Sequence, residues 1–193
     1  MQDDELPPFA AIPYPKGFHI DRLLSEACSH LSKTGVRLGG LLQISIGGAG
    51  GCATAVHTVD LRTGEEFDIW EERGTCATGC RLDEQGLLLA SKAITEAIDD
   101  RVDLVIVNRF GRAESLGRGL LDCIVCALDA QIPVLTAVRE PYDEAWAEFH
   151  GGLAVDLANN QAAICDWAHR NIGLPLDVAP VEQFAQQRGH EML

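Results

Sequence analysis

One stretch of this sequence, from Val102 to Leu128, constrains the fold more than any other. It opens with a short apolar run (102–107) rich in valine, leucine and isoleucine, which is typical of a strand buried on both faces. A polar loop follows from Asn108 to Arg118, and a helical pattern follows the loop. Because ligands of open α/β sheets bind beyond the carboxyl ends of parallel strands, we expect a site in this loop.

The rest of the chain repeats the alternation of strands and helices. Further strands are predicted at 9–12, 36–46 and 132–138, and helices at 21–33 (with Asp21 as its cap), 84–98, 119–130, 141–149 and 159–170. Two alternating runs flank the turn-type residues 62–65 and predict a β-hairpin over 54–70. The pattern predicts an α/β fold, with a three-layer, mainly parallel sheet and an inserted β-hairpin. We expect a disordered lead-in over 1–8, a single domain over 9–173 and a loosely packed tail over 174–193.

Charge and hydropathy exclude several classes of function. The chain has 29 acidic and 15 basic residues, a formal net charge of −14. This balance argues against binding to nucleic acid or to an anionic membrane, since both require a basic surface. An apolar run long enough to span a bilayer is absent from the sequence, and its acidic N-terminus does not resemble a secretory signal. We therefore expect a soluble, cytoplasmic protein.

Five sequence segments, in this order, carry a family resemblance: GVRLGGLLQ, VDLRTGEEF, RGTCATGCRLD, DLVIVNRFGRAESLGRGL and IPVLTAVREPYDEAW. Over roughly residues 9–155 the chain resembles a bacterial domain-of-unknown-function family that is distantly similar to small P-loop nucleoside triphosphatases of the thermophile type. Members of that family are often encoded near molybdate-type ABC transporters, and some are labelled as transporter ATP-binding proteins. The resemblance implies a P-loop-like fold and a role connected with molybdate.

The sequence departs from the triphosphatase pattern at two places. A working P-loop needs G-x-x-x-x-G-K-[ST], but the segment YPKGFHID (14–21) has one glycine and lacks the Gly-Lys-Ser/Thr order. The acidic pair expected at the end of the Walker B strand is replaced by Asn108 and Arg109, and only Gly111 and Glu114 keep the spacing of that motif. We therefore predict a degenerate Walker A and no ordinary ATP hydrolysis.

The loop after the strand at 102–107 supplies the first set of candidate ligand-binding residues. Arginine guanidinium groups bind phosphate, molybdate or carboxylate with paired hydrogen bonds, and the loop offers Arg109, Arg112 and Arg118. Asn108 can orient the ligand, Gly111 permits close backbone approach, and Glu114 can orient a water molecule or pair with an arginine. The alternative is a surface loop whose arginine–glutamate pairs only aid solubility.

A second candidate loop lies at 73–83. Its arginines, Arg73 and Arg81, can neutralise an anion, and Gly74 and Gly79 permit close backbone approach. The alternative interpretation is that Asp83 caps the following helix, with Arg81 folded back onto a carboxylate.

The seven cysteines do not predict a disulfide framework in a chain without a secretory signal. Cys76 and Cys80 together with Cys123 and Cys126 offer four thiols for a structural zinc ion. The last two, however, lie in an apolar helical pattern that favours burial as small hydrophobic residues. We predict no metal site.

These observations favour a small oxyanion- or nucleotide-binding protein that does not hydrolyse its ligand and is accessory to molybdate or related oxyanion metabolism. Its expected ligand is molybdate, phosphate or a nucleotide, and no cofactor is assigned. Two alternatives stay open. One is a divergent nucleoside triphosphatase in which Glu114 is catalytic and positions the attacking water. The other is an oligomeric interaction protein without a small ligand.

Overall fold

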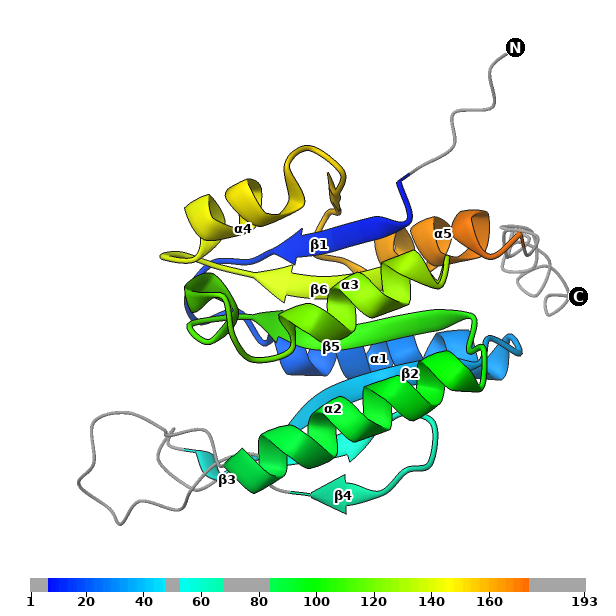
Figure 1. Cartoon of the computed structure of the whole chain (residues 1–193), viewed down its shortest axis with the longest axis horizontal. Helices are drawn as coiled ribbons and strands as arrows, with labels where there is room; N and C mark the ends of the chain where they lie inside the picture. Colours follow the sequence, from blue (N-terminus) through cyan, green and yellow to red (C-terminus); the bar gives the residue numbers. More distant parts are fainter. Residues whose placement is uncertain (1–6, 48–52, 68–83, 174–193) are drawn as a thin grey trace, which may run out of the picture.

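The computed structural model describes residues 7–47, 53–67 and 84–173, and these residues form an α/β fold around one seven-stranded sheet (Figure 1). The strands are arranged in the order β4-β3-β2-β5-β6-β1-β7. Five of them (β2, β5, β6, β1 and β7) are parallel to one another, and β3 and β4 continue the sheet beyond β2 as antiparallel strands at one edge. Their bounds are β1 (Phe9–Pro13), β2 (Leu38–Gly47), β3 (Ala53–Asp60), β4 (Glu66–Phe67), β5 (Leu104–Phe110), β6 (Val134–Val138) and β7 (Val155–Asp156).

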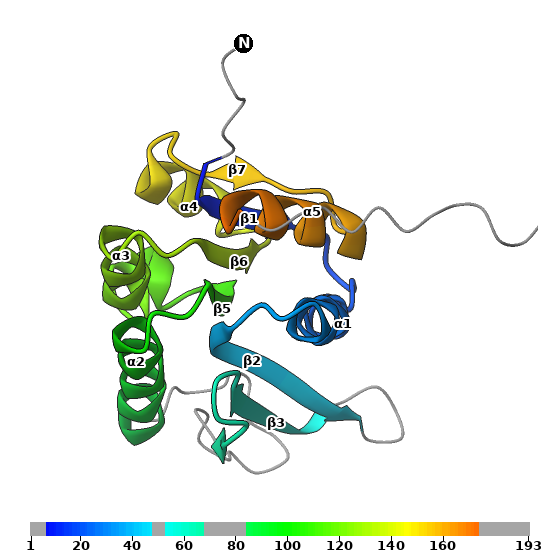
Figure 2. The same cartoon turned by 90° about the vertical axis from the view of Figure 1, so that its right-hand side faces the viewer.

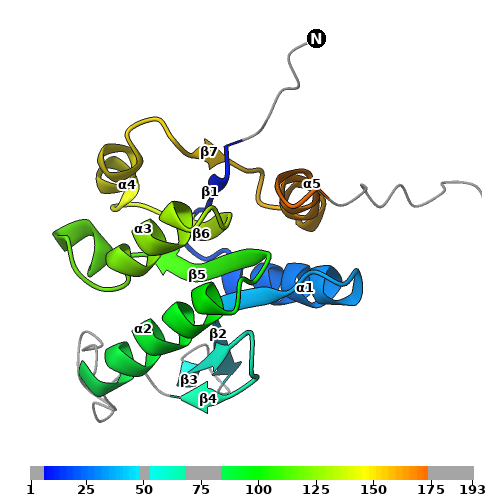
Figure 3. The same cartoon turned by 45° about the vertical axis from the view of Figure 1, so that its right-hand side comes forward.

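Helices cover both faces of the sheet, which gives the three layers predicted from the sequence (Figures 2 and 3). One face carries α1 (Ile20–Lys33) and α5 (Gln161–Asn171). The other face carries α2 (Glu84–Asp99), α3 (Leu121–Asp129) and α4 (Asp143–His150). A short 3₁₀ helix, η1 (Glu114–Leu116), lies in the connection from β5 to α3.

The central strand β5 is buried on both faces, as its apolar sequence predicts. Leu104 and Ile106 pack in the cluster under α1 and α5, whereas Val105 and Val107 pack in the cluster under α2, α3 and α4. This alternation follows from the two-residue period of a strand. Gly40 of β2 permits the close approach to β5, because its φ is +94° and a Cβ there would lie 2.1 Å from the carbonyl oxygen of Ile106.

Two boundaries differ from the sequence prediction in ways that affect the site. Strand β5 continues to Phe110 instead of ending at 107, so Asn108 and Arg109 lie within the strand rather than in a loop. Phe110 keeps the chain extended, because it is 2% exposed and packs edge-on against Trp146, with ring centroids 5.4 Å apart. In α1 the capping position is His19 rather than Asp21, which lies in the first turn.

Most of the predicted helices and strands are confirmed, one strand was missed, and the predicted domain limits are not tested. The inserted hairpin and the five helices are confirmed to within about two residues at most ends. Strand β7 was not predicted, since two residues are too short to show a pattern. Among the described residues, the helices are too short or too polar to cross a lipid bilayer. The lead-in over 1–8, the single domain over 9–173 and the tail over 174–193 stay predictions, and residues 1–6 and 174–193 lie outside the described part of the chain.

Candidate functional site

Three neighbouring strands end together at one edge of the sheet. Val138 at the end of β6 pairs with Pro13 of β1 on one side and with Phe110 of β5 on the other. The connection from β1 to α1 therefore starts beside the connection from β5 to α3. Because all three strands are parallel, this is the edge at which α/β proteins bind ligands.

A bulge in β5 turns two consecutive polar side chains toward the same partners. The pairing of β5 with β6 advances from Val107–Thr136 to Phe110–Val138, which is three residues on one strand against two on the other. The extra residue lets Asn108 and Arg109 both reach Gln43 of β2, although side chains of a regular strand alternate between faces.

These residues and Asp21 of α1 form one hydrogen-bonded network, here called the Arg109 network (Asp21, Gln43, Asn108 and Arg109). Nη2 of Arg109 lies 2.7 Å from each carboxylate oxygen of Asp21, and its Nη1 donates to Oε1 of Gln43 at 3.0 Å. The amide nitrogen of Asn108 donates to Asp21 Oδ1 (3.1 Å) and to Gln43 Oε1 (3.3 Å). The backbone N–H of Gln43 donates to Asn108 Oδ1 at 3.1 Å.

Solvent exposure increases across the Arg109 network, from its buried amide side chains to the partly exposed guanidinium. Asn108 and Gln43 are only 8% and 6% exposed. The side chains of Asp21 and Arg109 are 19% and 38% exposed, so the guanidinium is the part of the network most accessible to solvent. A paired charge held on buried amides has a fixed position, and this makes Arg109 a preorganised cation at the ligand-binding edge of the sheet.

The loop after β5 is organised by Glu114. Its Oε2 accepts the backbone N–H of Gly111 (3.0 Å), and its Oε1 accepts the backbone N–H of Leu120 (3.1 Å). Gly119 must be a glycine here, because its φ is +72° and a Cβ would lie 2.2 Å from Oε1 of Glu114. In the described structure the carboxylate therefore holds the two ends of its own loop together.

The other two arginines of this loop, Arg112 and Arg118, are exposed. Within the described residues their guanidinium groups take part in no hydrogen bond or ion pair. Of the ligand-binding residues predicted around β5, the structure thus joins Asn108 with Arg109 and joins Gly111 with Glu114. The predicted residues Arg73, Gly74, Gly79 and Arg81 lie outside the described residues, so their roles stay predictions.

The connection from β1 to α1 uses several backbone N–H groups internally. Tyr14 donates to the carbonyl of Val138 (3.0 Å), Phe18 to Pro15 (3.1 Å), and Ile20 to the carbonyl of Phe18 (3.0 Å). Pro13 and Pro15 carry no N–H at all. A phosphate-binding loop instead directs successive backbone N–H groups at its ligand.

The cysteines described in the structure behave in two ways. Cys123 is buried in α3, and burial raises the pKa of its thiol above the ordinary value. Cys126, by contrast, is exposed on the same helix, so the prediction that both are buried is wrong for Cys126. Cys76 and Cys80 are not among the described residues, and those that are described contain no group of three or more histidine, cysteine, aspartate or glutamate side chains suited to a metal.

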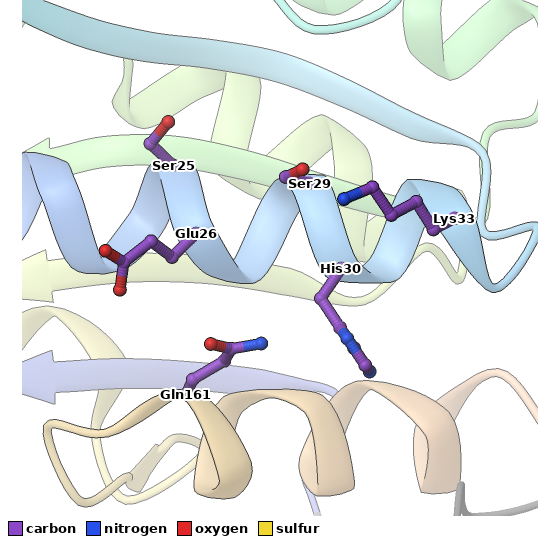
Figure 4. Close-up of a pocket in the computed structure, with 6 residues that line it drawn as sticks. All are labelled: Ser25, Glu26, Ser29, His30, Lys33 and Gln161. Atoms are coloured by element: carbon purple, nitrogen blue, oxygen red, sulfur yellow. The ribbon is translucent and has the colours of Figure 1, made fainter.

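A polar groove of about 430 Å³ lies between α1 and α5, away from the Arg109 network. Figure 4 shows His30 of α1 directed toward α5, Gln161 of α5 facing α1, and the side chain of Glu26 lying along α1. Ser25, Ser29 and Lys33 complete the lining. None of the four residues of the Arg109 network lines this groove, so the two features are separate.

Sequence reasoning missed three residues at the strand-end edge: Asp21, Gln43 and Arg139. Asp21 was assigned to a helix cap, and Gln43 lies in the middle of a mainly apolar strand. Arg139 directly follows β6, so the argument that selected the residues after 107 would also have selected it.

The fold matches that of a known nucleoside triphosphatase. The solution structure of a human cancer-related nucleoside triphosphatase superposes with a TM-score of 0.58, covering 82% of this chain and 94% of that chain at 14% sequence identity. At this identity the match shows the fold alone, and it confirms the resemblance to a P-loop nucleoside triphosphatase.

The side chains at the strand-end edge do not fit the Mg²⁺ ion that P-loop nucleoside triphosphatases use. Those enzymes hold Mg²⁺ with a P-loop hydroxyl and a Walker B aspartate. Here the first turn of α1 offers Asp21 and β5 offers Asn108, but Asp21 already binds Nη2 of Arg109 through both oxygens. A divalent cation on the same oxygens would lie beside a guanidinium and be repelled by it.

Two sequence comparisons place the chain in a family. It is 40% identical over 158 residues to a protein named Molybdenum import ATP-binding protein ModC 2 from Bradyrhizobium diazoefficiens. That alignment covers 82% of this chain but only 18% of the relative, so the chain corresponds to a small part of a much longer protein. The family model described as "Protein of unknown function (DUF2478)" matches residues 9–167. Since this match spans most of the sequence, the chain belongs to the DUF2478 family.

Proposed function

We propose that this protein binds a small oxyanion, or the phosphate groups of a nucleotide, at the strand-end edge of its sheet and does not hydrolyse it. The observation that carries the proposal is the Arg109 guanidinium, which is held in place by Asp21 and Gln43 yet 38% exposed. A fixed, partly exposed guanidinium offers an anion its positive charge and the Nη1 hydrogen that Gln43 does not use.

The charge distribution around this edge supports the proposal. Three neighbouring strands each lead to a basic residue at the same edge: Lys16 follows β1, Arg109 lies near the end of β5, and Arg139 follows β6. The exposed Arg112 and Arg118 follow in the loop after β5. The segments 14–21, 108–120 and 139–140 thus hold five cations and three carboxylates, the latter being Asp21, Glu114 and Glu140. In a chain with a net charge of −14, this positive local balance favours an anionic ligand.

The lack of hydrolysis is supported by the two loops. The Tyr14–Asp21 segment has no Gly-Lys-Ser/Thr order, and its Tyr14, Phe18 and Ile20 N–H groups are already paired, which is consistent with a degenerate Walker A. Glu114 would have to release the N–H groups of Gly111 and Leu120 before it could orient a water molecule.

The relative named for molybdenum import supports molybdate as the first ligand to test. Molybdate is a tetrahedral dianion of the same general shape as phosphate and sulfate, so the partly exposed guanidinium of Arg109 can donate a charge-assisted hydrogen bond to it. We propose on this basis that the protein is accessory to molybdate or related oxyanion metabolism.

A thermal-shift titration tests the proposed site. Wild type is heated with molybdate, tungstate, phosphate, sulfate or ATP, and the same series is run on Arg109→Ala and on Arg22→Ala. Arg22 is the matched control, because it lies next to Asp21, is highly exposed and pairs only with Glu26 in the described structure. A ligand at a hundred times its Kd stabilises the native state by about 2.7 kcal/mol.

We expect one or more oxyanions to raise the Tm of wild type and of Arg22→Ala by several degrees, and to have little effect on Arg109→Ala. Equal shifts in all three proteins would show that the site lies elsewhere. No shift with any anion would contradict the proposal and favour an interaction protein without a small ligand. Magnesium-dependent phosphate release that disappears in Glu114→Gln would instead favour the divergent triphosphatase.

A further inference from the structure

Two residues that stand where the P-loop pattern expects metal-binding groups, Asp21 at the Ser/Thr position and Asn108 at the Walker B position, belong to the Arg109 network in this protein. Asp21 in the first turn of α1 and Asn108 near the end of β5 are within hydrogen-bonding distance of each other (3.1 Å). Arg109, the next residue of the strand, places Nη2 at 2.7 Å from both oxygens of Asp21.

From this arrangement, and on the basis of the proposed function, we propose that the Arg109 guanidinium takes the place of the divalent cation. It is a positive charge built into the chain, held by Asp21 and Gln43, and the oxyanion binds to it without Mg²⁺. The ligand class is therefore a metal-free tetrahedral oxyanion, or a nucleotide phosphate not complexed with Mg²⁺.

The oxygen atoms of the Arg109 network show why a metal ion is not accommodated as well. Both oxygens of Asp21, Oδ1 of Asn108 and Oε1 of Gln43 all accept hydrogen bonds from N–H groups. Mg²⁺ binds oxygen ligands in a strict octahedral geometry at about 2.0–2.1 Å. To enter, it would have to displace the guanidinium from Asp21 and break the bonds between the amides.

The guanidinium also keeps one donor hydrogen for a second anion. A guanidinium carries five N–H groups, two of them on each terminal nitrogen. Nη2 donates to Asp21, and Nε is buried without a partner among the described residues. Nη1 uses one of its two hydrogens on Gln43, and the side chain is 38% exposed. An oxyanion can therefore bind from the solvent side while Asp21 stays in place and holds the guanidinium.

Binding of Mn²⁺ to the ligand-free protein tests the inference independently of any anion. Free Mn²⁺ is followed by electron paramagnetic resonance in titrations of the full chain and of Asp21→Asn, which measures background binding to the acidic surface. The double variant Asn108→Asp/Arg109→Ala removes the guanidinium and adds a second carboxylate. A triple variant that also carries Asp21→Asn is its control.

We expect the wild-type chain and Asp21→Asn to bind Mn²⁺ equally weakly. The double variant should gain about one Mn²⁺ per chain, and the triple variant should lose it. A wild-type Mn²⁺ site that disappears in Asp21→Asn would overturn the inference. A double variant that melts cooperatively but gains no Mn²⁺ would overturn it too. If the double variant does not fold, the comparison of wild type with Asp21→Asn still decides the question.

A second titration separates this inference from the proposed function. Molybdate and phosphate are titrated into wild type in the presence of EDTA and again with millimolar Mg²⁺. Affinities that agree within about twofold support the built-in cation. Anion binding that requires Mg²⁺ would overturn the inference but leave the proposed anion binding standing. Absence of anion binding under both conditions would contradict the proposed function. In that case the Mn²⁺ titration would still test whether Arg109 occupies the metal position.

Discussion

Strand β5 carries an arginine–aspartate pair at each end, and the two pairs have different surroundings. Where the strand begins, Arg37 pairs with Asp103, with Nη2 of Arg37 at 2.7 Å from Oδ1 of Asp103. Near its other end, Arg109 pairs with Asp21 at the same distance. The side chains of the first pair are 60% and 29% exposed, and those of the second are 38% and 19% exposed.

The partners around each pair determine what it can do. Asp103 also accepts the backbone N–H of Arg37 (2.8 Å), and Arg37 donates to the carbonyl of Arg101, so this pair joins the chain segments that lead into β2 and β5. Asp21 and Arg109 instead contact the buried amides of Asn108 and Gln43. An ion pair fixed to backbone is a structural link, whereas one fixed to buried side chains at the ligand-binding edge can serve as a site.

The largest effect is expected from Asn108→Ala. Asn108 is 8% exposed and makes three hydrogen bonds. Its loss leaves the Gln43 backbone N–H without this acceptor and removes the Asn108 donor from the side chains of Asp21 and Gln43. We expect the free energy of unfolding to fall by about 2–3 kcal/mol, measured by urea denaturation. The control is Asn171→Ala, which removes a single bond to the carbonyl of Trp167. Equal losses in the two variants would mean that the three hydrogen bonds of Asn108 stabilise the fold no more than the single hydrogen bond of Asn171.

Asp21→Asn is expected to have the next largest effect and to distinguish the two pairs directly. The variant leaves Arg109 without its counter-charge, and we expect a loss of about 1–2 kcal/mol in urea denaturation. Since Asp21 no longer neutralises the guanidinium, the affinity for an oxyanion should rise, whereas Asp103→Asn should leave that affinity unchanged. If the oxyanion instead binds more weakly to Asp21→Asn, then the positioning of Arg109 by Asp21 increases the affinity by more than the negative charge of Asp21 reduces it.

How far the sequence predicted this site depends on which contacts are local. The apolar run at 102–107 predicted a strand buried on both faces, and this is confirmed. The ligand site expected just after that strand stays a prediction. The partners of Arg109 were not predicted, because Asp21 and Gln43 lie 88 and 66 residues away in sequence. They meet only because β2 is adjacent to β5 and because a bulge directs Asn108 and Arg109 to the same side.

Glu114 shows a second limit of pattern reading. Its spacing from Gly111 matches a catalytic motif, and this suggested a role in positioning water. The structure shows why the same spacing also suits a loop contact: Glu114 lies three residues beyond Gly111 and accepts its N–H. Only the conformation of Gly119, at φ +72°, brings Leu120 to the other carboxylate oxygen, and no local sequence pattern indicates that contact.

Glu114→Gln tests the carboxylate in the loop after β5. In the described structure, only backbone N–H groups donate to this carboxylate. A glutamine keeps one acceptor oxygen but turns an NH₂ group toward either Gly111 or Leu120. We expect a loss of about 1 kcal/mol, or a Tm lower by about 2–4 °C. Glu148→Gln, on the exposed side of α4, is the control and should leave the Tm unchanged. An unchanged Tm in Glu114→Gln would mean that these two hydrogen bonds do not stabilise the loop.

The smallest effect is expected for Asp103→Asn, and its pH dependence identifies the charge as the cause. Partial burial raises the pKa of the Asp103 carboxyl. Hydrogen bonds from the side chain and backbone of Arg37, together with the charge of Arg37, lower the pKa by more than burial raises it, so the pKa lies below its ordinary value. A lowered pKa stabilises the folded state above the ordinary aspartate pKa of about 3.9, and this stabilisation is lost as the pH falls.

We therefore expect Asp103→Asn to unfold about 0.5–1 kcal/mol more easily than wild type at pH 7, as is typical of exposed ion pairs. The difference should be unchanged when urea denaturation is repeated at pH 5 and should shrink at pH 3, because below about pH 3.9 the unfolded wild-type chain takes up a proton on Asp103 and part of the stabilisation is lost. Glu26→Gln, in the more exposed pair with Arg22, is the control and should show a smaller difference at every pH. A difference for Asp103→Asn that stays constant from pH 7 to pH 3 would mean that neutral hydrogen bonds hold this end of β5, and that charge matters only at the end that carries Arg109.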